Sequence, residues 1–347
     1  MPVAIEHPHS SRPAPRGRAA GPARASLRIA LVNNMPDAAL ADTEEQFTAL
    51  LAAAAGERPV QLAFHYLPAV PRGPEARARL ADAYFSLAEL FDRSYDGVIL
   101  TGAEPLQPDL RAEAYWPELV ELLRWAESHT HSAVLSCLAA HAAVLQESGI
   151  PRQPLARKRI GVFAEQVAQA HPLTRGARPT VYFPHSRWNE LRQEDLAVHG
   201  YAILTHAPRA GTGLFIKPRG RSLFVHLQGH PEYHATTLLK EYRRDVRRFL
   251  RGERPDYPSL PHNYFDPEST RALAAFERQA LARPDPALLA EFPDGPIAAR
   301  LECKWAVDAV RLYQNWLDYL AARPMATTPA LASAPMVGAR SGASSPR

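Results

Sequence analysis

The chain has 347 residues, of which 46% are hydrophobic, so it can form one large or two ordinary globular domains with a substantial core. Its formal charge is +4, but the excess arginines lie in the two ends and the body mixes both signs, so we set aside a nucleic-acid-binding protein. Two cysteines exclude a disulfide framework, and no Cys/His spacing resembles a zinc or other metal site. No stretch approaches the roughly 18 apolar residues of a membrane span, so we expect a cytoplasmic protein without a membrane partner.

The ends and the first half of the chain have distinct patterns. Residues 1–26 and 324–347 carry few large apolar side chains and are predicted to be disordered tails. Between them, apolar runs predict strands at 27–34, 60–67, 95–102 and 132–137, separated by helices at 39–55, 86–92 and 115–129. This succession predicts an α/β fold with a mostly parallel sheet and helices on both faces. Functional groups of such a sheet gather at the carboxyl ends of the strands.

After residue 150 the apolar runs become shorter. The segments "GVFAEQVA", "TVYFPHSR", "YAILTHA" and "GTGLFIKP" have hairpin-like spacing, which predicts an antiparallel extension. The chain then rejoins the sheet in "SLFVHLQGHPEY" (222–233) and continues into an amphipathic helix at 234–252. We expect a main domain over 27–265 and a helical C-terminal extension over 266–323 that packs on it.

Cys137 is the first candidate for chemistry, in "VLSCLAAHAAVL". It ends a predicted strand and precedes a predicted helix, where the positive end of the helix dipole stabilises a thiolate. Ala139 and Ala140 allow close packing at the turn, and the first N–H groups of the helix could receive an oxyanion. A buried structural cysteine is the alternative reading of this segment alone.

His230 and Glu232 are the second candidates, in "GHPEY" at the end of another apolar run. His230 can accept the thiol proton, and Glu232 can orient the imidazole. This pairing requires the strand before His230 to lie beside the strand before Cys137. One histidine among 14 is weak evidence, whereas Cys, His and Glu at strand ends are a stronger signal.

Several segments together resemble a known family. They are, in chain order, "NNMPDAALADTEEQF", "YDGVILTGAEP", "VLSCLAAHAAVL", "KRIGVF", "PHSRW", "GHPEY" and "NYFDP". In this order they resemble the homoserine O-acyltransferases of the homoserine O-succinyltransferase family, which have a class I glutamine amidotransferase-like fold. The resemblance covers about 27–265, the acyltransferase domain, and resumes at "NWLDYL" (315–320) after an apparent insertion.

The resemblance implies acyl transfer from acyl-CoA to homoserine through a cysteine thioester, in methionine biosynthesis. Its nucleophile, base and orienting acid fall on Cys137, His230 and Glu232. Its substrate-binding positions fall on Lys158, Ser186 and Arg244. The oxyanion and acyl pocket falls on Gly102, Ala103, Leu106 and Leu138. Acyl-CoA is a co-substrate, no cofactor or metal is expected, and a homodimer is one candidate for the oligomeric state.

Three departures from the family pattern leave the acyl donor open. Asp37 and Ala38 replace the lysines expected after Pro36, and Leu138 replaces a tryptophan. Leu106 occupies the position that separates succinyl from acetyl donors, where the family has Gly or Glu. We favour succinyl-CoA slightly over acetyl-CoA, with Arg111 or Lys158 as the cation for its carboxylate.

Other functions remain open at this point. A glutamine amidotransferase-like amidase would use the same triad, although the glycines that usually flank its nucleophile are Leu135 and Ala139 here. The acceptor could be serine or another hydroxy amino acid. A catalytically silent binding module would not need an intact triad. Cys303 is interpreted as structural or incidental.

Overall fold

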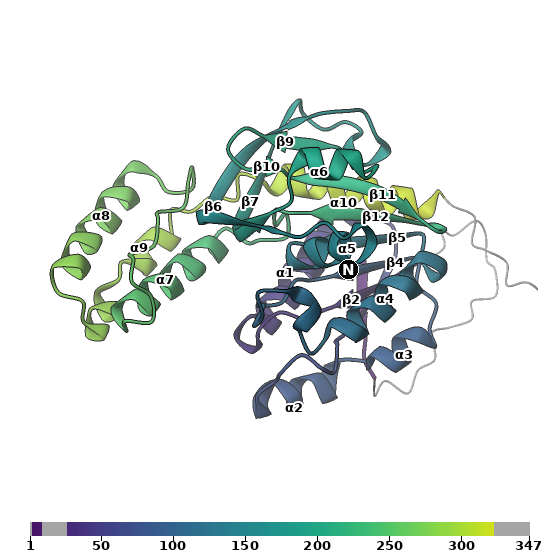
Figure 1. The fold of residues 1–347 in the computed structure, drawn as a ribbon, viewed down its shortest axis with the longest axis horizontal. Helices are drawn as coiled ribbons and strands as arrows, with labels where there is room; N and C mark the ends of the chain where they lie inside the picture. Colours follow the sequence, from purple (N-terminus) through teal and green to yellow (C-terminus); the bar gives the residue numbers. More distant parts are fainter. Residues whose placement is uncertain (1, 9–25, 323–347) are drawn as a thin grey trace, which may run out of the picture.

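The computed structural model describes residues 2–8 and 26–322. Its main sheet has eight strands, and helices lie on both sides of it (Figure 1). Its strand order is β1-β3-β2-β4-β5-β12-β11-β8. The strands are β1 (Val3–Glu6), β2 (Leu27–Val32), β3 (Val60–His65), β4 (Gly97–Leu100), β5 (Ser132–Ser136), β8 (Ala202–Ile203), β11 (Leu214–Arg219) and β12 (Ser222–Leu227). From β1 to β12 all neighbours in this order are parallel. The last two pairs, β12 with β11 and β11 with β8, are antiparallel. The predicted mostly parallel sheet is confirmed.

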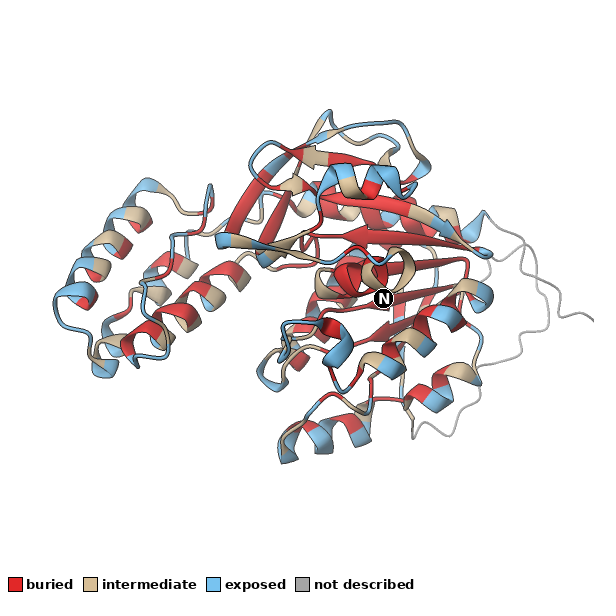
Figure 2. Cartoon of the chain, viewed as in Figure 1, coloured by how far each residue is buried: buried red, intermediate tan, exposed pale blue. Residues whose placement is uncertain are grey.

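Successive side chains of a strand point to opposite faces of the sheet, and both faces are buried here. Ile29 and Leu31 pack on one side, with α1 (Leu40–Ala55) and α10 (Ala306–Ala321). Ala30 and Val32 pack on the other. That second side is covered by α3 (Leu87–Phe91), α4 (Trp116–His129) and α5 (Leu138–Ser148). Figure 2 shows the resulting band of buried residues through the middle of the molecule. None of the described helices is both long and apolar enough to span a membrane.

A second, four-stranded sheet forms the predicted antiparallel extension. Its order is β10-β9-β6-β7, with all neighbours antiparallel. The strands are β6 (Gln153–Val167), β7 (Thr180–Glu190), β9 (Thr205–Ala207) and β10 (Gly211–Thr212), accompanied by η3 (Pro172–Thr174) and α6 (Gln193–Val198). This sheet touches the main one where Pro184 O accepts a hydrogen bond from His230 N at 2.7 Å.

The remaining helices lie around these sheets. Figure 1 draws α7 (Thr237–Leu250), α8 (Pro267–Ala282) and α9 (Asp294–Ala298) at one end of the molecule, where Tyr242 and Phe292 contact each other with ring centroids 6.2 Å apart. The connecting segment contains η4 (Pro286–Glu291). Helix α10 returns to the main sheet, where Trp316 Nε1 donates to Ser132 Oγ at 3.0 Å. The region 266–323 therefore packs in two places. Helix α2 (Pro74–Ala83), η1 (Asp37–Ala39) and η2 (Leu110–Ala112) complete the described elements.

The predicted tail over 1–26 is wrong for residues 3–6. These residues form β1, which extends the sheet beside β3 from the pair Val3↔Val60 to the pair Glu6↔Ala63. Val3 is buried against the core of the main sheet. A four-residue strand flanked by prolines and histidines gives too short a pattern to recognise. The predicted tail over 324–347 lies outside the described residues.

Candidate active site

Cys137 occupies a sharp turn between β5 and α5. Its φ is 50°, which makes it one of two non-glycine residues with positive φ in the described part of the chain. Such a conformation is strained and is held only where the surroundings require it. Here Cys137 N donates to Leu227 O at 2.7 Å, and Cys137 O accepts from His141 N at 3.3 Å. The turn has the form of the predicted nucleophile elbow.

Strand β12 brings His230 and Glu232 to this turn. It runs parallel to β5, with Leu227 paired to Ser136, so both chains leave the sheet at the same edge. Gly229 allows close approach there, because a Cβ on it would lie 3.0 Å from Pro184 O. His230 Nδ1 lies 2.8 Å from Glu232 Oε1, and both side chains are buried.

The pKa of His230 depends on both of its neighbours in the triad. Burial lowers the pKa of the imidazole, but the charges of Cys137 and Glu232 and their hydrogen bonds raise it well above 6.5. Because Nδ1 faces Glu232, Nε2 is the nitrogen available to Cys137. The surroundings therefore favour the protonated imidazole, and Glu232 fixes the orientation of its ring.

Two backbone N–H groups beside Cys137 are available to an oxyanion. A Cβ added to Gly102 would lie 3.2 Å from Leu138 N, so the turn after β4 packs directly on the first residue of α5. Within the described residues, the N–H groups of Ala103 and Leu138 donate no hydrogen bond. Gly102, Ala103 and Leu138 line the cavity that contains Cys137. Backbone donors in this position can stabilise a tetrahedral intermediate.

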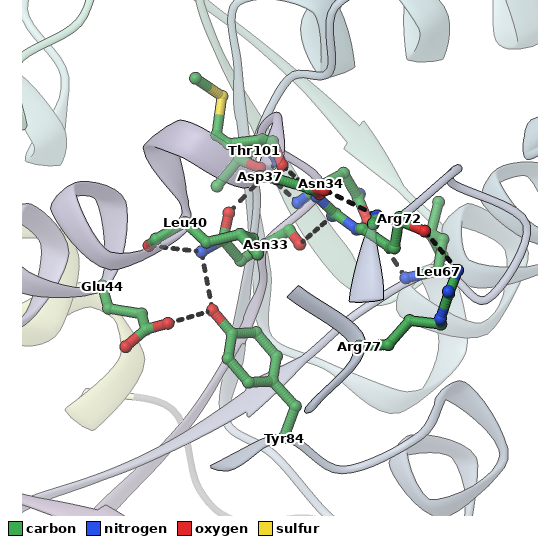
Figure 3. A network of polar contacts seen from close by, with 12 residues as sticks. Asn33, Asn34, Asp37, Leu40, Glu44, Leu67, Arg72, Arg77, Tyr84 and Thr101 are labelled. Atoms are coloured by element: carbon green, nitrogen blue, oxygen red, sulfur yellow. Dashed lines mark hydrogen bonds and ion pairs between the residues drawn. The ribbon is translucent and has the colours of Figure 1, made fainter. Parts of the chain in front are cut away.

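A polar network fixes the loop that follows β2 (Figure 3). Asn33 Nδ2 donates to Tyr84 OH at 2.9 Å, and Asn34 N donates to Thr101 Oγ1 at 2.8 Å. Arg72 donates to the carbonyl oxygens of Asn33 and Met35. The network thereby places Met35 and Pro36 in the wall of the cavity.

Asp37 replaces an expected lysine of the family pattern and belongs to this same network. Its carboxylate lies 3.2 Å from Arg72 Nη1 and accepts from Gly73 N at 2.7 Å. It does not line the cavity that contains Cys137, and neither does Ala38. The substituted position therefore anchors a loop in this chain.

The cavity around Cys137 has a volume of about 420 Å³ and contains a cluster of four charged side chains. Lys158 Nζ lies 2.8 Å from Asp245 Oδ2 and 3.2 Å from Glu241 Oε2. Arg244 pairs with the same two carboxylates. The three predicted substrate-binding residues meet here, because Ser186 Oγ also donates to Glu241.

Glu241 is the centre of this cluster. Besides Ser186, it accepts a hydrogen bond from Tyr233 OH at 2.6 Å. Burial alone would raise the pKa of its carboxyl. The positive charges of Lys158 and Arg244 outweigh that effect and, with these hydrogen bonds, lower the pKa to about 2. Glu241 is therefore ionised at neutral pH and balances the two cations.

Leu106 and Arg111, which we expected near the acyl group, lie elsewhere. Leu106 is 68% exposed and does not line the cavity around Cys137. Its N–H donates to Glu113 Oε1 at 2.6 Å, which holds the loop away from the triad. Arg111 pairs with Asp109 on the exposed surface at 2.9 Å. The structure therefore does not bring either residue to Cys137.

Sequence reasoning missed several residues that line the cavity around Cys137, among them Asp245 and five others. These five are Tyr233, Glu241, Trp188, Arg248 and Arg254. The sequence signal for Glu241 is its position three residues before Arg244 on a predicted helix, which indicates an ion pair but not that the carboxylate faces the cavity. Arg248 pairs with Glu104 at 3.1 Å, whereas Arg254 makes no ion pair within the described residues.

A second cavity of about 400 Å³ lies beside the first and also reaches the triad. His230, Tyr233 and Arg244 line both cavities, whereas Glu232 lines only the second. Within residues 2–8 and 26–322, no group of three or more His, Cys, Asp or Glu side chains is arranged to hold a metal ion.

Comparisons with known proteins point to one family. The family profile described as homoserine O-succinyltransferase matches residues 13–327. The homoserine O-succinyltransferase of Rhodopseudomonas palustris is 46% identical over 300 residues, which are 86% of this chain and 89% of that protein. That of Methylorubrum extorquens is 42% identical over 302 residues, with 87% and 89% covered. Among solved structures, a glutamine amidotransferase from Thermotoga maritima has a TM-score of 0.43 at 12% identity, covering 86% of this chain and 99% of that one.

Proposed function

Because the chain belongs to the homoserine O-succinyltransferase family, we propose that it transfers a succinyl group from succinyl-CoA to the hydroxyl of homoserine through a thioester on Cys137. The observation that supports this most directly is the position of a balanced charge cluster beside the Cys137–His230–Glu232 triad, in one cavity. O-acylation activates the homoserine hydroxyl as a leaving group, which is the chemistry needed before sulfur is introduced in methionine biosynthesis.

The first half-reaction acylates the enzyme. The thiolate of Cys137 attacks the thioester carbonyl of the donor. The oxyanion that forms accepts hydrogen bonds from the backbone N–H groups of Ala103 and Leu138. Collapse of the intermediate breaks the bond to the sulfur of coenzyme A. That sulfur takes the proton of the His230 imidazolium and leaves as a thiol.

The second half-reaction transfers the acyl group to the acceptor. Acylation removes the thiolate charge, which is the strongest influence raising the pKa of His230. The imidazole therefore stays neutral after it has given up its proton, and can accept the proton of the homoserine hydroxyl. The resulting alkoxide attacks the thioester, Cys137 leaves as a thiolate, and the proton remains on His230, held by Glu232.

The charge cluster suits an amino-acid acceptor. Lys158 and Arg244 offer two cations, and Glu241 and Asp245 offer two anions. A zwitterion can replace these internal pairs with its own carboxylate and ammonium groups, so no charge stays buried without a partner. Ser186 and Glu241 are then placed to receive the ammonium end, and Lys158 and Arg244 the carboxylate end.

A succinyl donor requires one more cation for its free carboxylate, because an unpaired buried charge is costly. Lys158 and Arg244 already pair with carboxylates, and Arg248 pairs with Glu104. Arg254 lines the same cavity and makes no ion pair in the described chain, and its guanidinium carbon lies 6.0 Å from the centroid of the Trp188 ring. We assign the succinyl carboxylate to Arg254.

The test mixes the protein with succinyl-CoA or acetyl-CoA and a panel that contains homoserine, serine and other hydroxy amino acids, and identifies products by mass. O-succinylhomoserine as the main product supports the proposal. Glutamine is included as a separate substrate, because release of ammonia from it without acyl transfer would favour an amidase instead.

A further inference from the structure

The side chains of α7 form a cationic stripe. Lys240, Arg243, Arg244 and Arg247 are spaced at i, i+3, i+4 and i+7, so they share one face of the helix. All four line a cavity of about 480 Å³. Its opposite wall comes from the segment between α8 and α10, through Leu289 of η4 and Asp294, Gly295 and Ala298 of α9.

The composition of this cavity is that of a site for a nucleotide. Four cations and one carboxylate, Asp294, line the cavity. Lys240 pairs with Asp42, and Arg244 pairs with Glu241 and Asp245, so Arg243 and Arg247 are the cations that remain to attract an anion. Leu239, Leu289 and Ala298 provide apolar surface for a flat base. Arginine side chains are well suited to phosphate because their planar donors bind it in pairs.

Two of these arginines have free donors. Within residues 2–8 and 26–322, Arg247 makes no ion pair and its side chain makes no hydrogen bond. Arg243 Nε lies 3.1 Å from Asp294 Oδ2, but its geometry leaves this buried nitrogen without a hydrogen bond. A buried donor without a partner is uncommon, and a phosphate oxygen would satisfy it.

The cavity is adjacent to the triad. It shares Lys240, Arg244 and Arg247 with the 400 Å³ cavity that contains His230 and Glu232. A ligand can therefore extend along α7, with its anionic end between α7 and α9 and its other end at His230. Acyl-CoA has this form, because a flexible arm separates its thioester from a 3′-phosphorylated adenosine diphosphate.

We propose that the nucleotide end of acyl-CoA binds between α7 and α9, with Arg247 and Arg243 on its phosphates. This inference rests on the proposed function for the identity of the ligand. It gives the segment 286–298 a role, as one wall of the donor site. The alternative path leads past Trp188 into a cavity of about 380 Å³, where two carboxylates, Asp245 and Asp256, stand against three cations. Its excess of positive charge is smaller than that of the cavity between α7 and α9, so it is less suited to phosphates.

The test measures binding of free CoA and dephospho-CoA to the full-length protein by titration calorimetry, without turnover. Arg247→Gln is the test variant. Arg251→Gln is the matched control, one turn further along, because Arg251 is exposed and lines none of the described cavities. Loss of charge-assisted hydrogen bonds to phosphate should weaken CoA binding to Arg247→Gln by about tenfold or more. The Arg251→Gln protein should bind CoA as the unmodified protein does.

The outcomes separate this inference from the proposed function. Equal affinities of the two variants for CoA, or no CoA binding by the unmodified protein, would overturn the inference. A larger loss for CoA than for dephospho-CoA would assign Arg247 to the 3′-phosphate, and an equal loss would assign it to the diphosphate. If CoA binds through Arg247 but no acylated homoserine forms, the donor site stands and the proposed reaction fails.

Discussion

The imidazole ring of His230 stacks on the phenol ring of Tyr233, with 4.2 Å between the ring centroids and 16° between their planes. The hydroxyl of the same tyrosine donates to Glu241 Oε1 at 2.6 Å. One side chain therefore contacts both the proposed base and the carboxylate that organises the charge cluster. The two contacts can be removed separately.

Tyr233→Phe keeps the ring and removes the hydroxyl. We expect KM for homoserine to rise by about tenfold, the usual effect of losing a hydrogen bond to a charged group, while kcat changes little. Tyr233→Leu also removes the stacked ring and should lower kcat, because His230 loses the surface that orients it. Steady-state kinetics of both variants test this assignment. An equal fall of kcat in the two proteins would contradict separate roles for the hydroxyl and the ring of Tyr233.

Cys137 and Cys303 should differ in reactivity. Cys303 is partly buried near the carbonyl of Tyr233, and burial raises the pKa of its thiol to about 11, so it is protonated at neutral pH. Incubation with succinyl-CoA alone should add one succinyl group to Cys137, found by peptide mass spectrometry. Cys137→Ser should abolish transfer and Cys303→Ser should not. A succinyl group on Cys303, or full activity of Cys137→Ala, would refute the thioester mechanism.

The titration of His230 should depend on the charge of Cys137. Burial lowers the pKa of His230 and the nearby thiolate raises it, so removing the thiolate leaves burial opposed mainly by Glu232. We expect the pKa of His230 to fall in Cys137→Ala, which is measured by NMR of the imidazole resonances against pH. His141 is an internal control, because burial lowers its pKa to about 3 and it should stay neutral in both proteins. An unchanged His230 pKa would mean that the two side chains do not interact.

The triad could be predicted from the sequence because each member follows an apolar run. Parallel strands place their carboxyl ends at one edge of the sheet, so Cys137 and His230 meet once β12 pairs with β5. Tyr233 and Glu241 could not be found in this way. Glu241 lies on a highly charged helix, where the sequence does not show which carboxylate turns inward.

The loop after β4 explains why Leu106 does not lie in the acyl pocket, where the sequence analysis placed it. Residues 101–105 lead away from the sheet without a periodic pattern, so nothing in the sequence fixes the direction of the next side chain. In the structure Glu113 accepts hydrogen bonds from the N–H groups of Leu106 and Gln107, and this contact turns the side chain of Leu106 outward. A correct alignment with a family position does not determine the direction of a side chain.

Donor preference should therefore respond to Arg254 and be insensitive to Leu106. Leu106 is exposed outside the cavity, so Leu106→Glu should leave the ratio of kcat/KM for succinyl-CoA to that for acetyl-CoA unchanged. Arg254→Gln removes the cation that we assign to the succinyl carboxylate. We expect kcat/KM for succinyl-CoA to fall by about tenfold or more, the effect of losing a charge-assisted hydrogen bond, and that for acetyl-CoA to change little.

The two variants are measured with both donors at a saturating concentration of homoserine, so that acceptor binding does not enter the comparison. A similar loss for both donors in Arg254→Gln would show that Arg254 acts on a part that the donors share, such as the pantetheine arm. A shift of the donor ratio in Leu106→Glu would show that the loop after β4 turns inward when the donor binds. Glu113→Gln would then be the next variant, because weakening its hold on the N–H of Leu106 should enlarge that shift.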